Sequence, residues 1–286
     1  MRSNLAQRVA FAAVAIPAAL GVVWYGGWVL TALVALVGVL GLRELFRFAR
    51  QQGIGALGGV AYPLALLLPL AAWLVVGPAG ADAGLALYAA PLALLLVFLA
   101  GLAARRPDQR PLASVAVTLF GVAYAAGLPA FLIVIRHGEG RPLMSWPAVW
   151  LTMFPLVLTW ACDTAAMFAG KLIGGPRLAP TVSPGKTWAG TIAGSLAAVA
   201  VAPAYAALAL LPGGVVLPLW QVGLFALLVS VVGQAGDLAE SLLKREVGVK
   251  DSSHLIPGHG GVLDRFDSLY FVLPVAAALY RAFGLL

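Results

Sequence analysis

The sequence predicts an all-α integral membrane protein that crosses the bilayer about nine times. Of the 286 residues, 62% are hydrophobic and only 10% are charged, whereas a soluble domain carries about 25% charged residues. A chain with so little charge cannot cover a folded surface against water, so the bilayer must be its main solvent. Backbone groups in lipid have to be hydrogen-bonded internally, which favours helices over strands.

Nine apolar stretches have the approximate length of a membrane span, which is roughly 20 residues at 1.5 Å per residue. In chain order they are residues 9–25, 27–42, 56–78, 84–104, 112–135, 145–162, 188–212, 215–236 and 269–286. The first is interpreted as a span and not as a cleaved signal peptide, because it lacks a persuasive small-residue cleavage site and leads directly into the second.

The basic residues indicate the orientation of the chain. The net charge is +7, and with the N-terminus in the cytoplasm only Arg136, Arg141 and Arg281 of the 18 Lys and Arg residues fall outside. This bias follows the positive-inside rule. It predicts a multi-pass protein of the inner cell membrane, with some attraction for anionic lipids and no nucleic-acid partner. The one cysteine, Cys162, excludes an intrachain disulfide and is interpreted as a core residue.

The chain is divided into three regions by the distribution of its polar residues. Residues 1–111 are predicted to be an N-terminal transmembrane scaffold without a cluster that suggests chemistry, and residues 112–162 a central transmembrane region. Residues 163–286 are predicted to be a catalytic region with its own transmembrane helices. Its two long loops, 163–188 and 237–268, fall on the cytoplasmic side, so a shared site is geometrically possible.

The second loop begins with a polar stripe. Spacings of i, i+3, i+4, i+7 and i+8 place five side chains on one helix face: Asp237, Glu240, Ser241, Lys244 and Arg245. A solvated helix face is the alternative interpretation. Asp237 continues directly from an apolar span, where a charge is expensive unless it faces a cavity or a partner, and this favours a functional stripe.

The same loop combines acids with cations around a run of glycines. Hard carboxylate oxygens suited to Mg²⁺ come from Asp237, Asp251, Asp264 and Asp267. Side chains suited to phosphate oxygens come from Lys244, Arg245, Lys250 and Arg265. Such a set is typical of phosphoryl or nucleotidyl transfer, with a structural ion-pair network as the alternative. Zinc would need more nitrogen or sulfur ligands than His259 and its neighbours offer.

The first loop contains a second group of phosphate-binding candidates. Gly185-Lys186-Thr187 resembles the end of a P-loop, but Pro180 stands where a glycine is required and no strand leads into it. A Walker A motif is therefore rejected. Lys186, with Ser183 and Thr187, could still donate to a triphosphate or a lipid phosphate.

Residues 241–267 resemble the signature of the phosphatidate cytidylyltransferases, also called CDP-diacylglycerol synthases. All seventeen specified positions match: Ser241, Leu243, Lys244, Arg245, Lys250, Asp251, Ser253, Ile256, Pro257, His259, Gly260, Gly261, Val262, Asp264, Arg265, Phe266 and Asp267. Asp163 and residues 178–188 resemble a second conserved segment of that family. The chain departs from the family at Ala189, where Glu is usual, and at Gly185, where Lys or Asn is frequent.

The resemblance implies a Mg²⁺-dependent reaction of CTP with phosphatidic acid that gives CDP-diacylglycerol and pyrophosphate, in a protein that is a homodimer. It implies Asp237 and Asp264 as metal ligands, with a second cation such as K⁺ nearby. It assigns Lys244, Arg245, Lys250 and Arg265 to phosphates. Asp251 and Asp267 are expected to hold these residues or the loop in position without contacting the substrates. The implied substrate-binding residues are Asp163, Ser183, Lys186, Thr187, Ser241, His259, Gly260 and Gly261, of which His259 also suits a loop-bracing role.

Two alternatives remain at this point, and one of them belongs to a different class of protein. One is a related membrane enzyme, such as a CTP-dependent polyprenol or phytol kinase or a polyprenyl-phosphate sugar transferase. The other is an ion-coupled transporter or channel, although transporters place their sites near the bilayer midplane and the acids here gather at one face.

Overall fold

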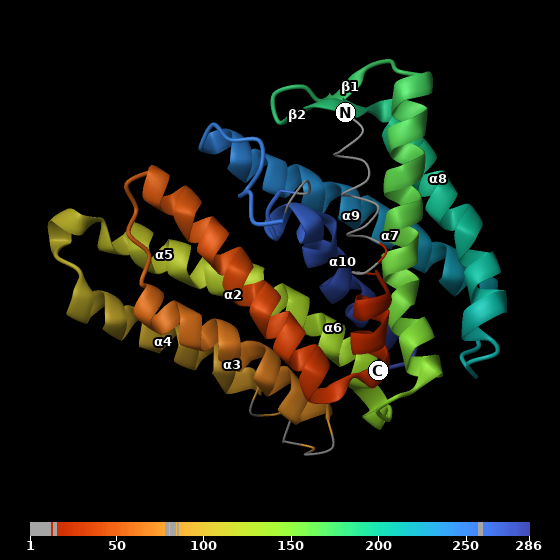
Figure 1. Cartoon of the computed structure of the whole chain (residues 1–286), viewed down its shortest axis with the longest axis horizontal. Coiled ribbons are helices and arrows are strands. Elements are labelled where there is room, and N and C mark those ends of the chain that lie inside the picture. The colour runs from red at the N-terminus through yellow and green to blue at the C-terminus, as the bar shows by residue number, and fades with distance from the viewer. Residues whose placement is uncertain (1–12, 14–15, 78–79, 81–83, 85, 257–259) are drawn as a thin grey trace. The chain divides into compact units, whose positions relative to one another are not determined.

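The computed structural model describes residues 13, 16–77, 80, 84, 86–256 and 260–286, and they are helical over most of their length (Figure 1). The chain divides into two compact units. The first contains residues 1–140 and 251–265, and the second contains residues 141–250 and 266–286.

The first unit is built from helices joined by short connections. Their bounds are Ile16–Tyr25, α2 Gly27–Gln51, α3 Gly58–Val76, α4 Ala86–Ala104, α5 Pro111–Val122, the π-helical turn η3 Ala123–Gly127 and α6 Leu128–His137, with 3₁₀ turns at Pro107–Gln109 and Gly138–Gly140. Small residues let α2 approach η3 closely, because a Cβ at Gly38 would lie 3.1 Å from the Cβ of Ala126. Leu42 and Phe46 of α2 pack into the same buried cluster.

The second unit contains α7 Trp146–Leu172, the antiparallel hairpin of β1 Arg177–Ala179 and β2 Ser183–Thr187, α8 Trp188–Tyr205, the π-helical turn η5 Ala206–Leu210 and α9 Leu219–Glu246. Helix α10, Leu263–Ala282, begins in the first unit and continues in the second. Stacked rings form the core of the second unit, with Phe225 lying 4.9 Å from Phe154 and 4.8 Å from Tyr280 between ring centroids. Cys162 is buried, as expected.

Each of the nine predicted apolar stretches overlaps a helix, and six described helices are long and apolar enough to cross a membrane. These six are Gly27–Gln51, Gly58–Val76, Pro111–Gly140, Trp146–Leu172, Trp188–Leu210 and Leu219–Glu246. Ile16–Tyr25 and Tyr88–Ala104 are apolar but shorter, and α10 carries Asp264, Arg265, Asp267 and Arg281. An all-α polytopic membrane protein is thus supported, whereas the number of nine spans stays a prediction.

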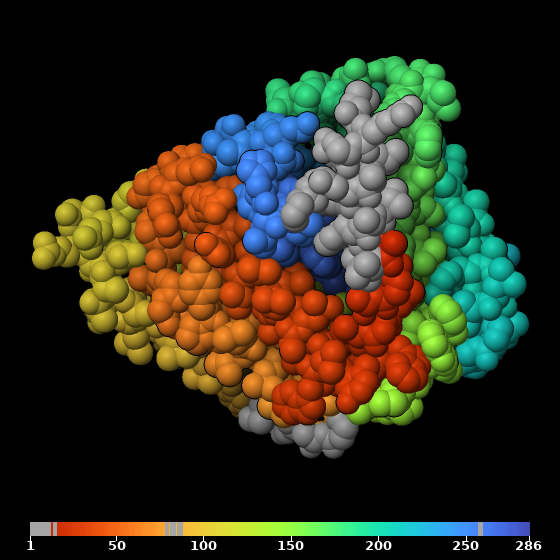
Figure 2. Space-filling view, in the orientation of Figure 1, coloured from red at the N-terminus to blue at the C-terminus, as the bar shows by residue number. Residues whose placement is uncertain are grey.

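Helix α4 illustrates how the first unit meets its surroundings. It lies at the edge of that unit (Figure 2), where Leu95, Phe98, Leu99 and Leu102 are exposed. An apolar helix face of this kind is costly in water and suits contact with lipid tails.

Candidate active site

The predicted meeting of the two loops is present in the second unit. The β1–β2 hairpin pairs Arg177 with Thr187 and so places Lys186 just before α8. The Nζ atom of Lys186 lies 2.7 Å from Oδ2 of Asp237 on α9, and both side chains are partly exposed. A cation of the first loop and an acid of the second therefore face each other, about two and a half turns before the end of α9.

The carboxylates of Asp163 and Asp267 lie close enough to Asp237 to interact with its charge. Burial and, after it, the negative charges of Asp237 and Asp163 raise the pKa of Asp267 to about 7, although the backbone hydrogen bond from Ser268 and the charge of Lys244 act to lower it. Because the charges of Asp163 and Asp237 both oppose the ionisation of Asp267, this group of acids creates a demand for positive charge. Lys186 meets part of that demand in this structure.

These residues fit a hard cation by the chemistry of their donors, because carboxylate oxygens are what Mg²⁺ prefers. Among the described residues, however, no three Asp, Glu, His or Cys side chains already converge closely enough to hold a metal ion. The ammonium of Lys186 contacts Asp237 in this structure. A bound cation would have to share that carboxylate with Lys186.

The polar stripe on α9 is turned inward, which removes the alternative of a solvated helix face. Glu240, Ser241 and Lys244 are buried, and Lys244 Nζ lies 3.2 Å from Oε1 of Glu240. The Ser241 hydroxyl donates to Oδ1 of Asp237 at 3.4 Å. Arg245 alone of the five is exposed; it donates to the carbonyls of Val182 and Val249 and so ties the end of α9 to the hairpin.

In the first unit the signature loop is organised around Glu44, a residue that the sequence analysis missed. This buried carboxylate of α2 accepts four hydrogen bonds. Oε1 accepts from the Ser253 hydroxyl at 2.6 Å and the Val262 amide at 3.0 Å. Oε2 accepts from the Ser252 hydroxyl at 2.8 Å and the Leu263 amide at 2.9 Å. A carboxylate at the N-terminus of α10 also suits the helix dipole.

Asp264 organises the same loop from the other side. Its Oδ2 atom accepts hydrogen bonds from the Ser252 and Gly261 amides, each at 2.8 Å, and lies 2.9 Å from the Ser252 hydroxyl, whose single proton is shared between Asp264 and Glu44. No side chain fits at Gly261, since a Cβ there would lie 2.0 Å from Ser252 Oγ and 2.6 Å from Glu44. Glu44 and Asp264 thus brace the loop, and the supporting roles expected of Asp251 and Asp267 stay predictions.

The remaining candidates are placed as follows. Thr187 is buried, and its hydroxyl caps α8 by accepting from the Gly190 amide at 3.1 Å. Gly260 has a φ of +83°, in the left-handed region that favours glycine. Ser183 is partly exposed, and three residues at the ends of the loop are exposed: Lys250, Asp251 and Arg265. His259 lies outside the described residues. Asp237 belongs to the second unit and Asp264 to the first, and their shared role as metal ligands stays a prediction.

Residues 6–283 match the model of the cytidylyltransferase family. The chain therefore belongs to this family of nucleotidyltransferases. It is 34% identical to the phosphatidate cytidylyltransferase of Synechocystis over 94% of both chains. It is 32% identical to the chloroplastic phosphatidate cytidylyltransferase 5 of Arabidopsis thaliana over 99% of this chain and 73% of that one. It is 52% identical to the phosphatidate cytidylyltransferase of Brucella suis over 46% of each chain.

Proposed function

We propose that the protein is a CTP:phosphatidate cytidylyltransferase, which converts CTP and phosphatidic acid to CDP-diacylglycerol and pyrophosphate. The observation that carries this proposal is the similarity to the Synechocystis enzyme of that name along nearly the whole of both chains. Neither the kinase alternative nor the transporter alternative finds support in the relatives. The contact between Lys186 and Asp237 adds a physical reason, because it joins a cation for phosphates to an acid for a metal.

The chemistry makes modest demands on general acid–base catalysis. A phosphate oxygen of phosphatidate attacks the α-phosphorus of CTP and forms the new P–O bond. The bond from that phosphorus to the β-phosphate oxygen breaks, and its electron pair leaves with pyrophosphate. The nucleophile is already an anion, so catalysis consists of holding two polyanions together and stabilising the charge on the leaving group.

The residues would divide this task between acids and cations. Asp237 and Asp264 would hold Mg²⁺, with Asp163 and Asp267 close to Asp237 and a second cation such as K⁺ nearby. The bound metal would neutralise phosphate charge and orient the reacting groups. Lys186 would turn from Asp237 to a phosphate oxygen, and further contacts to phosphate would come from Lys244, Arg245, Lys250 and Arg265.

The proposed placement of the protein in the cell is based on its charge distribution. A multi-pass protein of the inner membrane, with its active site facing the cytoplasm, would let water-soluble CTP meet a lipid that stays in the bilayer. The bias of Lys and Arg toward one side of the predicted topology supports this orientation. The homodimer is proposed from the family resemblance alone.

The test uses the purified protein in detergent micelles with phosphatidate, Mg²⁺ and CTP that is labelled at either the α- or the γ-phosphorus. The proposal predicts that α-label enters the lipid and that γ-label leaves as pyrophosphate. Transfer of γ-label to a lipid would instead indicate a kinase. Asp237→Asn should abolish transfer at unchanged expression, and Asp108→Asn, an exposed acid of the 3₁₀ turn Pro107–Gln109, is the matched control.

A further inference from the structure

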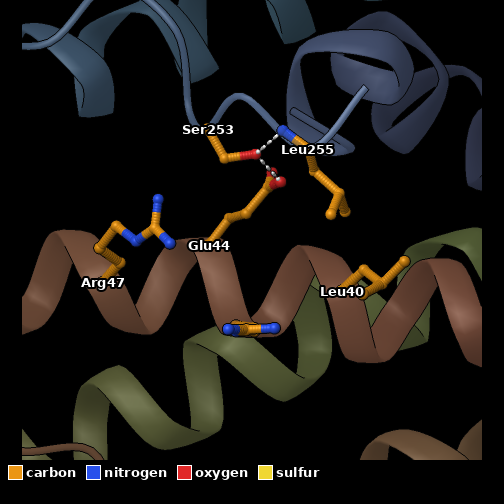
Figure 3. A pocket seen from close by; sticks show the side chains of 6 residues that line it. Leu40, Glu44, Arg47, Ser253 and Leu255 are labelled. Carbon is orange, nitrogen blue, oxygen red and sulfur yellow. Dashed lines mark hydrogen bonds between the residues drawn. The ribbon is translucent and has the colours of Figure 1, made fainter. Parts of the chain in front are cut away.

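A pocket in the first unit combines basic, polar and apolar walls. It has a volume of about 120 Å³ and is lined by Leu40, Arg43, Glu44 and Arg47 of α2 and by Ser253 and Leu255 of the signature loop. A single water needs roughly 10–15 Å³ of such space, so the five heavy atoms of a phosphate group fit. Figure 3 shows Glu44 reaching from α2 to Ser253, with Arg47 on one side of it and Leu40 on the other.

The two arginines of this pocket are available to a ligand. They are four residues apart on α2 and therefore share one helix face, and both are exposed. Among the described residues, neither guanidinium has a hydrogen-bond or ion-pair partner. Glu44 would be the natural counter-ion, but its two oxygens already accept from two serine hydroxyls and two backbone amides.

The chemistry of the walls identifies the ligand class. Two guanidinium groups on one face suit a phosphate monoester, which each of them can bind through parallel N–H donors. Leu40 and Leu255 supply apolar surface next to this charge, and Leu255 is 50% exposed. The arginines lie near the end of a helix that is apolar enough to span the membrane, where a lipid presents its headgroup to water.

We infer that this pocket binds the phosphate of the lipid substrate, phosphatidate, through Arg43 and Arg47. The inference rests on the proposed function and adds a binding site in the N-terminal half of the chain. Glu44 is its positioning residue, because it holds the wall formed by Ser253 against α2 and leaves both guanidinium groups unpaired. The signature loop would then form one wall of the lipid site as well as carrying Asp264.

The test measures binding of dioctanoyl phosphatidate to the full-length protein in detergent micelles, without CTP. Arg43→Gln and Arg47→Gln should each weaken binding about tenfold, and the double variant more, because each removes a charge-assisted contact. Arg50→Gln is the matched control: Arg50 is an exposed arginine of the same helix end outside the pocket, so binding should change less than twofold. Unchanged binding in the double variant would overturn the inference, as would an equal loss in Arg50→Gln, which would indicate general attraction to anionic headgroups.

Further arms separate the sources of phosphate and the two proposals. Inorganic phosphate should compete poorly, and competition equal to that of dioctanoyl phosphatidate would assign the pocket to free phosphate instead. A double change of Arg43 and Arg47 to Lys should restore part of the affinity, and thermal unfolding should match the wild type. In steady state, Arg43→Gln with Arg47→Gln should raise KM for phosphatidate and leave KM for CTP unchanged. If the wild type binds the lipid through these arginines but never forms CDP-diacylglycerol, the proposed function is wrong and the lipid pocket is supported. If it forms CDP-diacylglycerol but binds the lipid independently of these arginines, the proposed function is supported and the pocket is wrong.

Discussion

Replacing Glu44 tests whether a buried carboxylate of α2 holds the signature loop in place. Glu44→Gln keeps the volume of the side chain but puts an NH₂ group where one oxygen accepts from a backbone amide, of either Val262 or Leu263. An unsatisfied buried donor costs about 1–3 kcal/mol, and each 1.4 kcal/mol is a factor of ten in an equilibrium constant. Glu44→Ala removes both acceptors, so its cost should be about 2–6 kcal/mol by the same reasoning.

Hydrogen–deuterium exchange measures this loss of free energy at the affected amides, because local opening controls how well they are protected from exchange. In Glu44→Gln, exchange in a peptide that covers Val262 and Leu263 should accelerate by about 5–150-fold, and in Glu44→Ala by more. Glu139→Gln is the matched control, since Glu139 is an exposed acid of the same unit. Unchanged exchange in Glu44→Ala would refute the assignment of Glu44 as the residue that organises the loop.

Four further predictions concern the rest of the site. Lys186→Met should lower cytidylyl transfer at least tenfold, because it removes a phosphate contact. It should change the free energy of unfolding by no more than about 1 kcal/mol, because the pair with Asp237 is partly exposed. A large drop in melting temperature relative to the control Lys171→Met would contradict this. The pKa of Asp267, raised to about 7, means that the folded protein keeps a proton which the unfolded chain loses near pH 4. Stability should therefore fall as pH rises from about 4 to about 7, and denaturation curves of Asp267→Asn should show a shallower fall; an identical slope would disprove the assignment. Gly261→Ala should destabilise the loop and abolish transfer, because its Cβ would collide with Ser252 and Glu44. The control Gly59→Ala should be tolerated, because the space around its Cβ is open. Equal melting temperatures and activities of the two variants would show that the loop can rearrange to accept a Cβ at Gly261. Removal of divalent cations with EDTA should stop product formation and added Mg²⁺ should restore it, and turnover that persists without divalent cations would exclude the metal role of the acids.

Composition and local pattern predicted most of the fold because both depend on neighbours in the sequence. The nine apolar stretches overlap helices, since a run of apolar residues in a chain with so little charge has few other ways to satisfy its backbone. Helix ends were less predictable. The span expected at 27–42 continues to Gln51, because α2 carries apolar residues between its arginines that pack in the first unit.

The site was predictable where the sequence carries a continuous signature and not where a contact depends on the fold. The meeting of Lys186 with Asp237 follows an expectation from topology. Glu44 was missed because its partners lie more than 200 residues away in the chain. The sequence did contain one signal for Glu44, which is an acid on a largely apolar helix. Burying such an acid requires a specific partner.

In the proposed reaction, a phosphate oxygen of the lipid attacks the α-phosphorus of CTP. An isotope experiment follows this oxygen, with phosphatidate whose non-bridging phosphate oxygens are ¹⁸O, unlabelled CTP and mass spectrometry of both products. Attack by the lipid phosphate gives CDP-diacylglycerol that retains all the ¹⁸O and pyrophosphate that contains none. Heavy oxygen in pyrophosphate, or a lipid product without a cytidylyl group, would contradict it.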